Sequence, residues 1–154
     1  MTDAASLRLP RAEAEAIIAE AQAHWPRECC GLVAGKDGRV VRRYPITNVY
    51  AGEDFYEMEA GQQRAALEEI WDEARCWSLL AVYHSHPVSV AYPSARDIAH
   101  ACWPETTEPI YPDTAYIICS LEDRARPILR AFFIGDGGAV REVAVEVEDG
   151  RQST

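Results

Sequence analysis

The stretch LLAVYHSHP at residues 79–87 decides how the rest of the chain folds. Residues 79–83 form an apolar run with no polar alternation, which predicts a central strand buried on both faces. Side chains two positions apart on a strand point to the same side, so His84 and His86 face one point while Ser85 faces away. We therefore expect two imidazoles to emerge together from the most rigid element of the fold.

A second polar motif, Ser94-x-x-Asp97, follows Pro87 after a loop and opens a predicted short helix. From the start of that helix, the Asp97 carboxylate can reach back as a third ligand to a zinc ion, which leaves a fourth position open for water. Each motif also has a structural interpretation. Paired histidines are often surface or core residues, and Ser94 with Asp97 matches a capping box, the better interpretation of that pair alone.

Length and composition fit one globular domain. The chain has 154 residues, of which 48% are hydrophobic, so it can build a real core. The formal charge of -10 argues against nucleic-acid or anionic-membrane binding, because both need Lys and Arg to neutralise phosphate. Residues 1–9 lack a basic segment followed by an apolar core, and no stretch approaches the ~20 apolar residues of a membrane span.

The five cysteines are odd in number, scattered and without a CxxC pair. This usage predicts reduced thiols, no structural disulfide and a cytoplasmic location. Cys29 or Cys30, assisted by a histidine, is an alternative nucleophile that the adjoining apolar strand residues disfavour. Ser85 lacks the Gly-x-Ser-x-Gly elbow of a serine nucleophile. His24 and His100 are expected to be helix-surface or packing residues.

Before the central strand, the sequence predicts a helix, a hairpin and a loop. The helix runs from Pro10, placed in its first turn, to His24. Residues 29–34 and 39–44 predict two strands joined by a glycine-containing turn. The segment 46–59 predicts a loop with a short strand at its end.

A second helix is expected to open at Gly61. Leu67, Ile70, Trp71 and Ala74 recur at helical spacing, which predicts one apolar stripe and solvated acidic residues on the other side. After the central strand, the sequence predicts a loop at 87–93, a short helix at 94–101, an irregular segment at 102–113, strands at 116–119, 128–134 and 140–147, and a tight turn at 135–138.

The polar motifs form one longer pattern. Glu28 lies far upstream of the histidine motif at 84–87 and of residues 94–97, and Asn48 and Phe55 lie between them. This pattern resembles the JAMM (MPN+) metallopeptidase family, whose motif is a distant Glu followed by His-x-His-Pro, a spacer and Ser-x-x-Asp.

The resemblance covers roughly residues 7–147 and implies the fold. It implies an α/β fold with a single MPN domain at 1–148. Its mixed, mostly antiparallel β-sheet would be flanked by helices in a cytidine-deaminase-like architecture. Residues 149–154 are expected to form a disordered tail.

The resemblance also implies the roles of the site residues. His84, His86 and Asp97 would hold one zinc ion per chain. Glu28 would be the general base that takes a proton from water and delivers it to the leaving amine, and Ser94 would stabilise the tetrahedral oxyanion. From the residues alone, Asp54, Glu57 and Glu59 are candidates for the base equal to Glu28.

Family members cleave the amide or isopeptide bond after the C-terminal Gly-Gly of ubiquitin-like proteins. The chain looks like the prokaryotic stand-alone branch, and is similar there to the enzymes that release cysteine from a small sulfur-carrier protein in cysteine biosynthesis. A desampylase-type isopeptidase acting on ubiquitin-like conjugates is the alternative. A non-catalytic MPN scaffold without metal and a zinc sensor or storage protein without turnover are two further hypotheses. A homodimer stays open.

Overall fold

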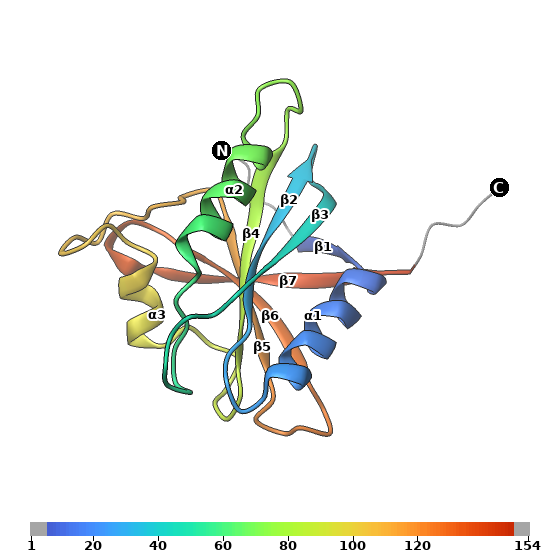
Figure 1. The fold of residues 1–154 in the computed structure, drawn as a ribbon, viewed down its shortest axis with the longest axis vertical. Helices are drawn as coiled ribbons and strands as arrows, with labels where there is room; N and C mark the ends of the chain where they lie inside the picture. Colours follow the sequence, from blue (N-terminus) through green and yellow to red (C-terminus); the bar gives the residue numbers. More distant parts are fainter. Residues whose placement is uncertain (1–5, 150–154) are drawn as a thin grey trace.

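The computed structural model describes residues 6–149, in which one curled seven-stranded sheet carries helices on both faces (Figure 1). The strands are β1 (Ser6–Pro10), β2 (Cys30–Lys36), β3 (Arg39–Ile46), β4 (Ser78–His86), β5 (Ala115–Ser120), β6 (Ile128–Ile134) and β7 (Val140–Glu148). Across the sheet they follow the order β1-β7-β6-β5-β4-β2-β3. The β1–β7 and β4–β5 pairs are parallel and the other neighbours antiparallel. The predicted α/β fold with a mixed, mostly antiparallel sheet is confirmed.

The predicted central strand is confirmed in β4, which lies between β2 and β5 and runs down the middle of Figure 1. Every residue from Ala81 to His86 is buried. Both histidines belong to the strand, because its hydrogen-bonded ladder with β5 continues as far as the pair His86 and Ser120. The site therefore begins on backbone that is fixed from both sides.

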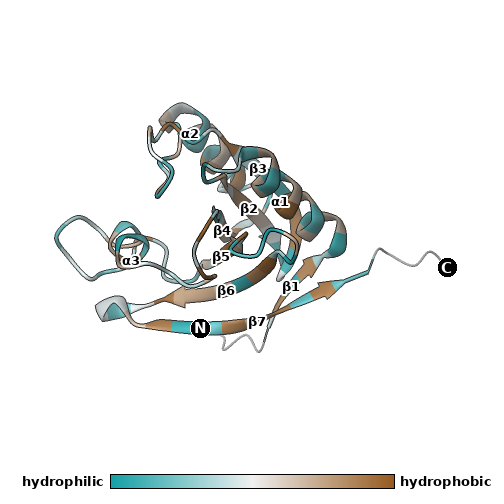
Figure 2. Ribbon diagram, turned by 90° about the horizontal axis from the view of Figure 1, so that it is seen from below, coloured by the Kyte–Doolittle hydropathy of each residue, from teal (hydrophilic) through white to brown (hydrophobic). Residues whose placement is uncertain are grey.

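The helices cover opposite faces of the sheet. They are α1 (Arg11–His24), α2 (Ala60–Ile70) and α3 (Ala95–His100), with a short 3-10 turn η1 (Asp136–Gly138). Figure 2 shows the sheet as a C-shaped layer with α1 on its concave side and α2 and α3 on its convex side. Ile17 of α1 packs in one apolar cluster with Tyr83, whereas Ile70 of α2 packs in another with Val82. Because Tyr83 and Val82 are neighbours on β4, their side chains serve the two faces alternately.

Helix α1 is held by a polar network as well as by its apolar face. Arg43 of β3 contacts Glu13 at 3.1 Å and Glu20 at 2.9 Å. The Tyr83 hydroxyl donates to Glu20 at 2.6 Å. Ion pairs of this half-buried kind fix geometry more than they add stability. The network therefore locks α1 to the strand that carries the histidines.

Two expectations at the ends of helices are wrong. Pro10 is the last residue of β1 and precedes the first helical residue, so it is not within the first turn of α1. Helix α2 ends at Ile70, which leaves Trp71 51% exposed and Ala74 outside the helix. The Asp72 side chain accepts the Ala74 N–H at 2.9 Å, so a turn replaces another helical turn there.

Strand β1 was not predicted, and the other elements match their predicted positions with small shifts. The short strand expected at the end of the 46–59 loop is reduced to a single bridge between Asn48 and Met58. In the predicted tail, Asp149 accepts a hydrogen bond from Arg11 at 2.7 Å, and residues 150–154 lie outside the described part of the chain. Among the described residues, no helix has the length and apolar character needed to cross a membrane.

Candidate metal centre

The pairing of β2 with β4 brings Glu28 to the histidines. Cys30 lies opposite His84 in this antiparallel pair. Beyond the last strand pair, Cys29 donates its N–H to the Ser85 Oγ at 2.8 Å and Ser85 donates its N–H to the Cys29 carbonyl at 3.1 Å. Continuing the register by one more residue places Glu28 beside His86, on the same face of the sheet.

Asp97 reaches the same point from α3. Ser94 caps this helix, because its Oγ accepts the Asp97 N–H at 3.0 Å while the Asp97 Oδ2 accepts the Ser94 N–H at 2.9 Å. This is the predicted capping box, which is confirmed. The box fixes the Asp97 carboxylate so that the same Oδ2 atom faces both imidazoles.

Three ligand atoms converge in a buried cluster. The His84 and His86 Nε2 atoms are 3.1 Å apart, and the Asp97 Oδ2 atom lies 3.3 Å from the first and 3.0 Å from the second. Two ligands about 2.0–2.1 Å from a tetrahedral zinc ion are about 3.3 Å from each other. The three side chains thus have the donor types and the spacing that zinc requires.

Hydrogen bonds orient the cluster. The His86 Nδ1 atom lies 2.7 Å from the Val90 carbonyl, which favours a proton on Nδ1 and leaves Nε2 free to bind a cation. Burial alone would raise the pKa of Asp97, but its contacts with His84 and His86 outweigh burial and hold that pKa well below its usual range. Burial lowers the pKa of His84. The site therefore combines a firmly ionised carboxylate with an imidazole that is readily neutral.

Glu28 is a buried acid without a partner. Its side chain is 4% exposed, and Oε1 has no hydrogen-bond partner in the described part of the chain. Burial raises the pKa of Glu28 to about 8, His86 opposes that change, and Asp97 reinforces it. A carboxyl group with these properties can exchange a proton near neutral pH.

Asn48 holds the backbone of Glu28 in place. Its Nδ2 donates to the Glu28 carbonyl at 2.9 Å, and its Oδ1 accepts the N–H groups of Tyr50 and Glu57 at 2.9 and 3.0 Å. Arg27 donates to the Asn48 carbonyl at 3.2 Å and to the Tyr50 carbonyl. These hydrogen bonds tie the loop after β3 to the backbone of Glu28.

The other candidates for the base lie in different settings. Asp54 and Glu57 are exposed, and Glu59 caps α2 by accepting the N–H groups of Gly61 and Gln62. Of these four acids, Glu28 is the buried one with a strongly raised pKa.

The alternative nucleophiles are buried and occupied. Burial raises the pKa of Cys29 far above its usual range and that of Cys30 to about 12, so neither thiol forms a thiolate readily. Ser85 is fully buried, and its Oγ accepts the Cys29 N–H. His24 lies exposed on α1, as expected.

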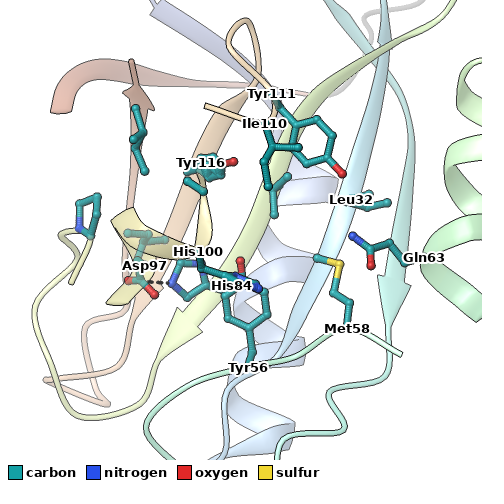
Figure 3. A pocket seen from close by; sticks show the side chains of 15 residues that line it. Leu32, Tyr56, Met58, Gln63, His84, Asp97, His100, Ile110, Tyr111 and Tyr116 are labelled. Carbon is teal, nitrogen blue, oxygen red and sulfur yellow. Dashed lines mark hydrogen bonds and ion pairs between the residues drawn. The ribbon is translucent and has the colours of Figure 1, made fainter. Parts of the chain in front are cut away.

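A small cavity of about 100 Å³ opens beside His84 and Asp97 (Figure 3). Tyr56 stacks on the His84 ring with centroids 4.6 Å apart, and His100 packs edge-on against Tyr56 at 5.4 Å. Much of the rest is lined by apolar side chains, with Gln63 of α2 among the polar ones. Tyr56 and His100 were not among the predicted site residues; the adjacent aromatic residues Phe55 and Tyr56 are a sequence feature that could have indicated this wall.

The chain is similar to several known proteins. The family model described as prokaryotic homologs of the JAB domain matches residues 10–134. The CysO-cysteine peptidase of Mycobacterium tuberculosis is 34% identical over 135 residues, 86% of each chain. The desampylase of Haloferax volcanii is 35% identical over 126 residues, 80% of each chain. A solution structure of a protein from Desulfitobacterium hafniense matches with a TM-score of 0.75 at 29% identity and covers 93% of each chain.

The fold and the sequence match define one class. The chain belongs to the prokaryotic JAB family, and its predicted membership of the JAMM (MPN+) class, in the prokaryotic stand-alone branch, is confirmed.

Proposed function

We propose that this chain is a zinc-dependent hydrolase. It cleaves the amide bond after the C-terminal Gly-Gly of a small ubiquitin-like or sulfur-carrier protein. The observation that carries the proposal is the convergence of the His84, His86 and Asp97 ligand atoms next to the buried carboxyl group of Glu28, whose Oε1 has no hydrogen-bond partner among residues 6–149. These three side chains would hold one zinc ion per chain. Zinc with three protein ligands keeps a position open at which it polarises a carbonyl and activates water.

The protein side chains divide the remaining work. The reaction adds water across the amide: the water oxygen bonds to the carbonyl carbon, the C–N bond breaks, and one proton passes to the amine. Glu28 takes that proton and returns it to the leaving nitrogen; burial raises its pKa in the metal-free protein, and a cation held beside it would favour the carboxylate that accepts the proton. The Ser94 Oγ accepts the Asp97 N–H, so its own hydrogen is free to donate to the oxyanion.

The proposed substrate class is inferred from the names of the relatives. One is named for a cysteine peptidase activity on CysO and another is a desampylase. A sulfur carrier extended by cysteine is the proposed substrate of this chain, and a protein conjugate of a ubiquitin-like protein is the alternative. All five cysteines are free thiols in the structure, which supports the proposed cytoplasmic location.

Metal analysis and a cleavage assay together test the proposal. Purified protein should contain about one zinc per chain. It should cleave carrier proteins ending in Gly-Gly that are extended by cysteine or lysine, as read by mass spectrometry. A chelator should stop cleavage and added zinc should restore it. Protein without zinc would support a scaffold, and bound zinc without cleavage would support a storage or sensor protein; either result contradicts the proposal.

A further inference from the structure

Arg96 of α3 lies at the rim of the site in a fixed orientation. Its guanidinium lies over the Phe55 ring at 4.2 Å and over the Tyr50 ring at 5.0 Å. Nη1 also donates to the Tyr50 hydroxyl at 3.1 Å. His100, one helical turn later, packs edge-on against the same Phe55 ring at 5.0 Å. Two rings and a hydroxyl thus hold a long, exposed side chain in one place.

The charge of Arg96 has no carboxylate of its own. Among residues 6–149, no acidic oxygen lies within 4 Å of its guanidinium, and the stacking leaves most of the planar N–H fork free. Asp97 is its neighbour in sequence but points inward to the histidines. A guanidinium held in this manner can receive a carboxylate from a bound molecule.

Arg96 belongs to the Glu28 side of the site. The Tyr50 hydroxyl accepts a hydrogen bond from Arg96. The Tyr50 carbonyl accepts one from Arg27, the residue before Glu28. The positive charge of Arg96 also acts to lower the pKa of Glu28. Glu28 is the group that protonates the leaving amine in the proposed reaction, so Arg96 lies on the leaving-group side.

We propose that Arg96 binds the α-carboxylate of the leaving amino acid. The preferred substrate would then be a carrier extended at its C-terminus by one amino acid, rather than a carrier joined to a lysine side chain. This inference rests on the proposed hydrolase function. In the extended carrier, the carboxylate carbon lies about 2.5 Å from the scissile nitrogen, so the free acid and the leaving amine enter the site together. An isopeptide brings no carboxylate to that place.

The negative charge around the site favours such a group. A substrate carboxylate next to the leaving nitrogen approaches Glu28 and Asp97, and Asp54 acts on the same region. The chain as a whole carries a formal charge of -10. Repulsion by these acids disfavours an anionic leaving group, and a cation fixed on the leaving-group side offsets it in addition to the proposed zinc ion. Arg96 supplies that cation.

Three substrates on one carrier test the inference. They end in Gly-Gly-Cys with a free carboxylate, in Gly-Gly-Cys carboxamide, and in Gly-Gly joined to the ε-amine of lysine. The zinc-loaded protein should cleave the free acid about 10- to 100-fold faster in kcat/KM than the carboxamide, as expected for a charge-assisted pair. Arg96→Gln should bring this ratio close to one, whereas Arg96→Lys should keep part of it.

The ratio of kcat/KM for the free acid to that for the carboxamide separates recognition of the carboxylate from the chemical step. Any effect of Arg96→Gln on the pKa of Glu28 changes both cysteine substrates alike, so it cancels. Arg39→Gln, an exposed arginine at the start of β3, should leave the ratio unchanged. Equal rates for acid and carboxamide in the unaltered protein, or a preference that survives Arg96→Gln, would overturn the inference and leave the hydrolase function standing. Cleavage of none of the three would overturn both.

Discussion

Replacing Glu28 by Gln should stabilise the metal-free protein and should remove the turnover of the zinc-loaded protein. The Glu28 side chain is 4% exposed, and its Oε1 has no hydrogen-bond partner in the described part of the chain. Burial raises its pKa from 4.5 to about 8. The unfolded chain keeps the lower value, so the native state binds a proton that the unfolded state releases.

The size of the effect depends on pH. Below pH 4.5 the carboxyl is protonated in both states, and its ionisation does not change stability. Between pH 4.5 and about 8 the unfolded chain is ionised and the native chain is not, so the free energy of unfolding falls by about 1.4 kcal/mol per pH unit. Local relaxation and water entry reduce the total of about 4 to 5 kcal/mol, and we expect a loss of a few kcal/mol at pH 8.

Urea unfolding of chelator-treated protein measures this loss. In the Glu28→Gln variant the side chain at position 28 is neutral at every pH. The advantage of the variant in free energy of unfolding over the unaltered protein should therefore be close to zero near pH 5 and grow to a few kcal/mol near pH 8. Zinc loading should shrink the advantage, because a nearby cation favours the carboxylate. Glu53→Gln, an exposed acid on the following loop, should show no such trend. An advantage that does not vary with pH would refute the buried, uncharged state of Glu28.

The same variant separates the base from the ligands. A general base contributes about 10²- to 10⁴-fold to turnover, and Gln cannot take the proton. Zinc content should nevertheless match that of the unaltered protein, because the three ligand side chains are untouched. Zinc loss equal to that of a ligand variant would contradict the role of Glu28.

Three further substitutions probe the site and its support. His84→Ala should abolish zinc binding and cleavage together, as read by metal analysis and by the mass-spectrometric assay. Ser94→Ala should keep zinc, because the backbone N–H to Asp97 Oδ2 remains, but lose about 10²- to 10³-fold in kcat and about 1 kcal/mol of stability with the cap. Gly31→Ala should lower the thermal midpoint by an amount equivalent to about 1–3 kcal/mol, because its Cβ would lie 2.4 Å from the buried Tyr83 ring; an unchanged midpoint would show that the ring can move.

Local sequence patterns predicted the elements that repeat over several residues. The apolar run of β4 and the Ala-rich α1 were placed within a few residues, since burial and helix propensity act over the whole segment. Strand β1 was not predicted. It has only five residues, and Leu7 and Leu9 become buried through parallel pairing with β7, more than a hundred residues away. The end of α2 was predicted too late because Trp71 fits the helical stripe by spacing and still lies at the surface.

The position of Glu28 at the site could not be predicted without the register of β2 against β4. Nothing local distinguishes it from Asp54, Glu57 or Glu59, and only the family pattern singled it out. In the structure, the pairing of Cys30 with His84 brings Glu28 to the end of β4 and under the loop held by Asn48. A one-residue slip would turn its side chain to the other face of the sheet. Information of this kind lies in pairing between distant segments, so single-sequence spacing could not supply it.

The six residues of α3 show why two interpretations of one motif did not exclude each other. Capping and metal binding compete when they are assigned to Ser94-x-x-Asp97 from sequence, yet in the structure a single Oδ2 atom accepts the Ser94 N–H and also faces the imidazoles of the proposed metal centre. The capping box stops rotation of the carboxylate, and a ligand fixed in advance loses less entropy on binding a cation. The same first turn holds Arg96 over the Phe55 ring. A helix too short to be stable alone thus orients a proposed ligand and a proposed substrate contact.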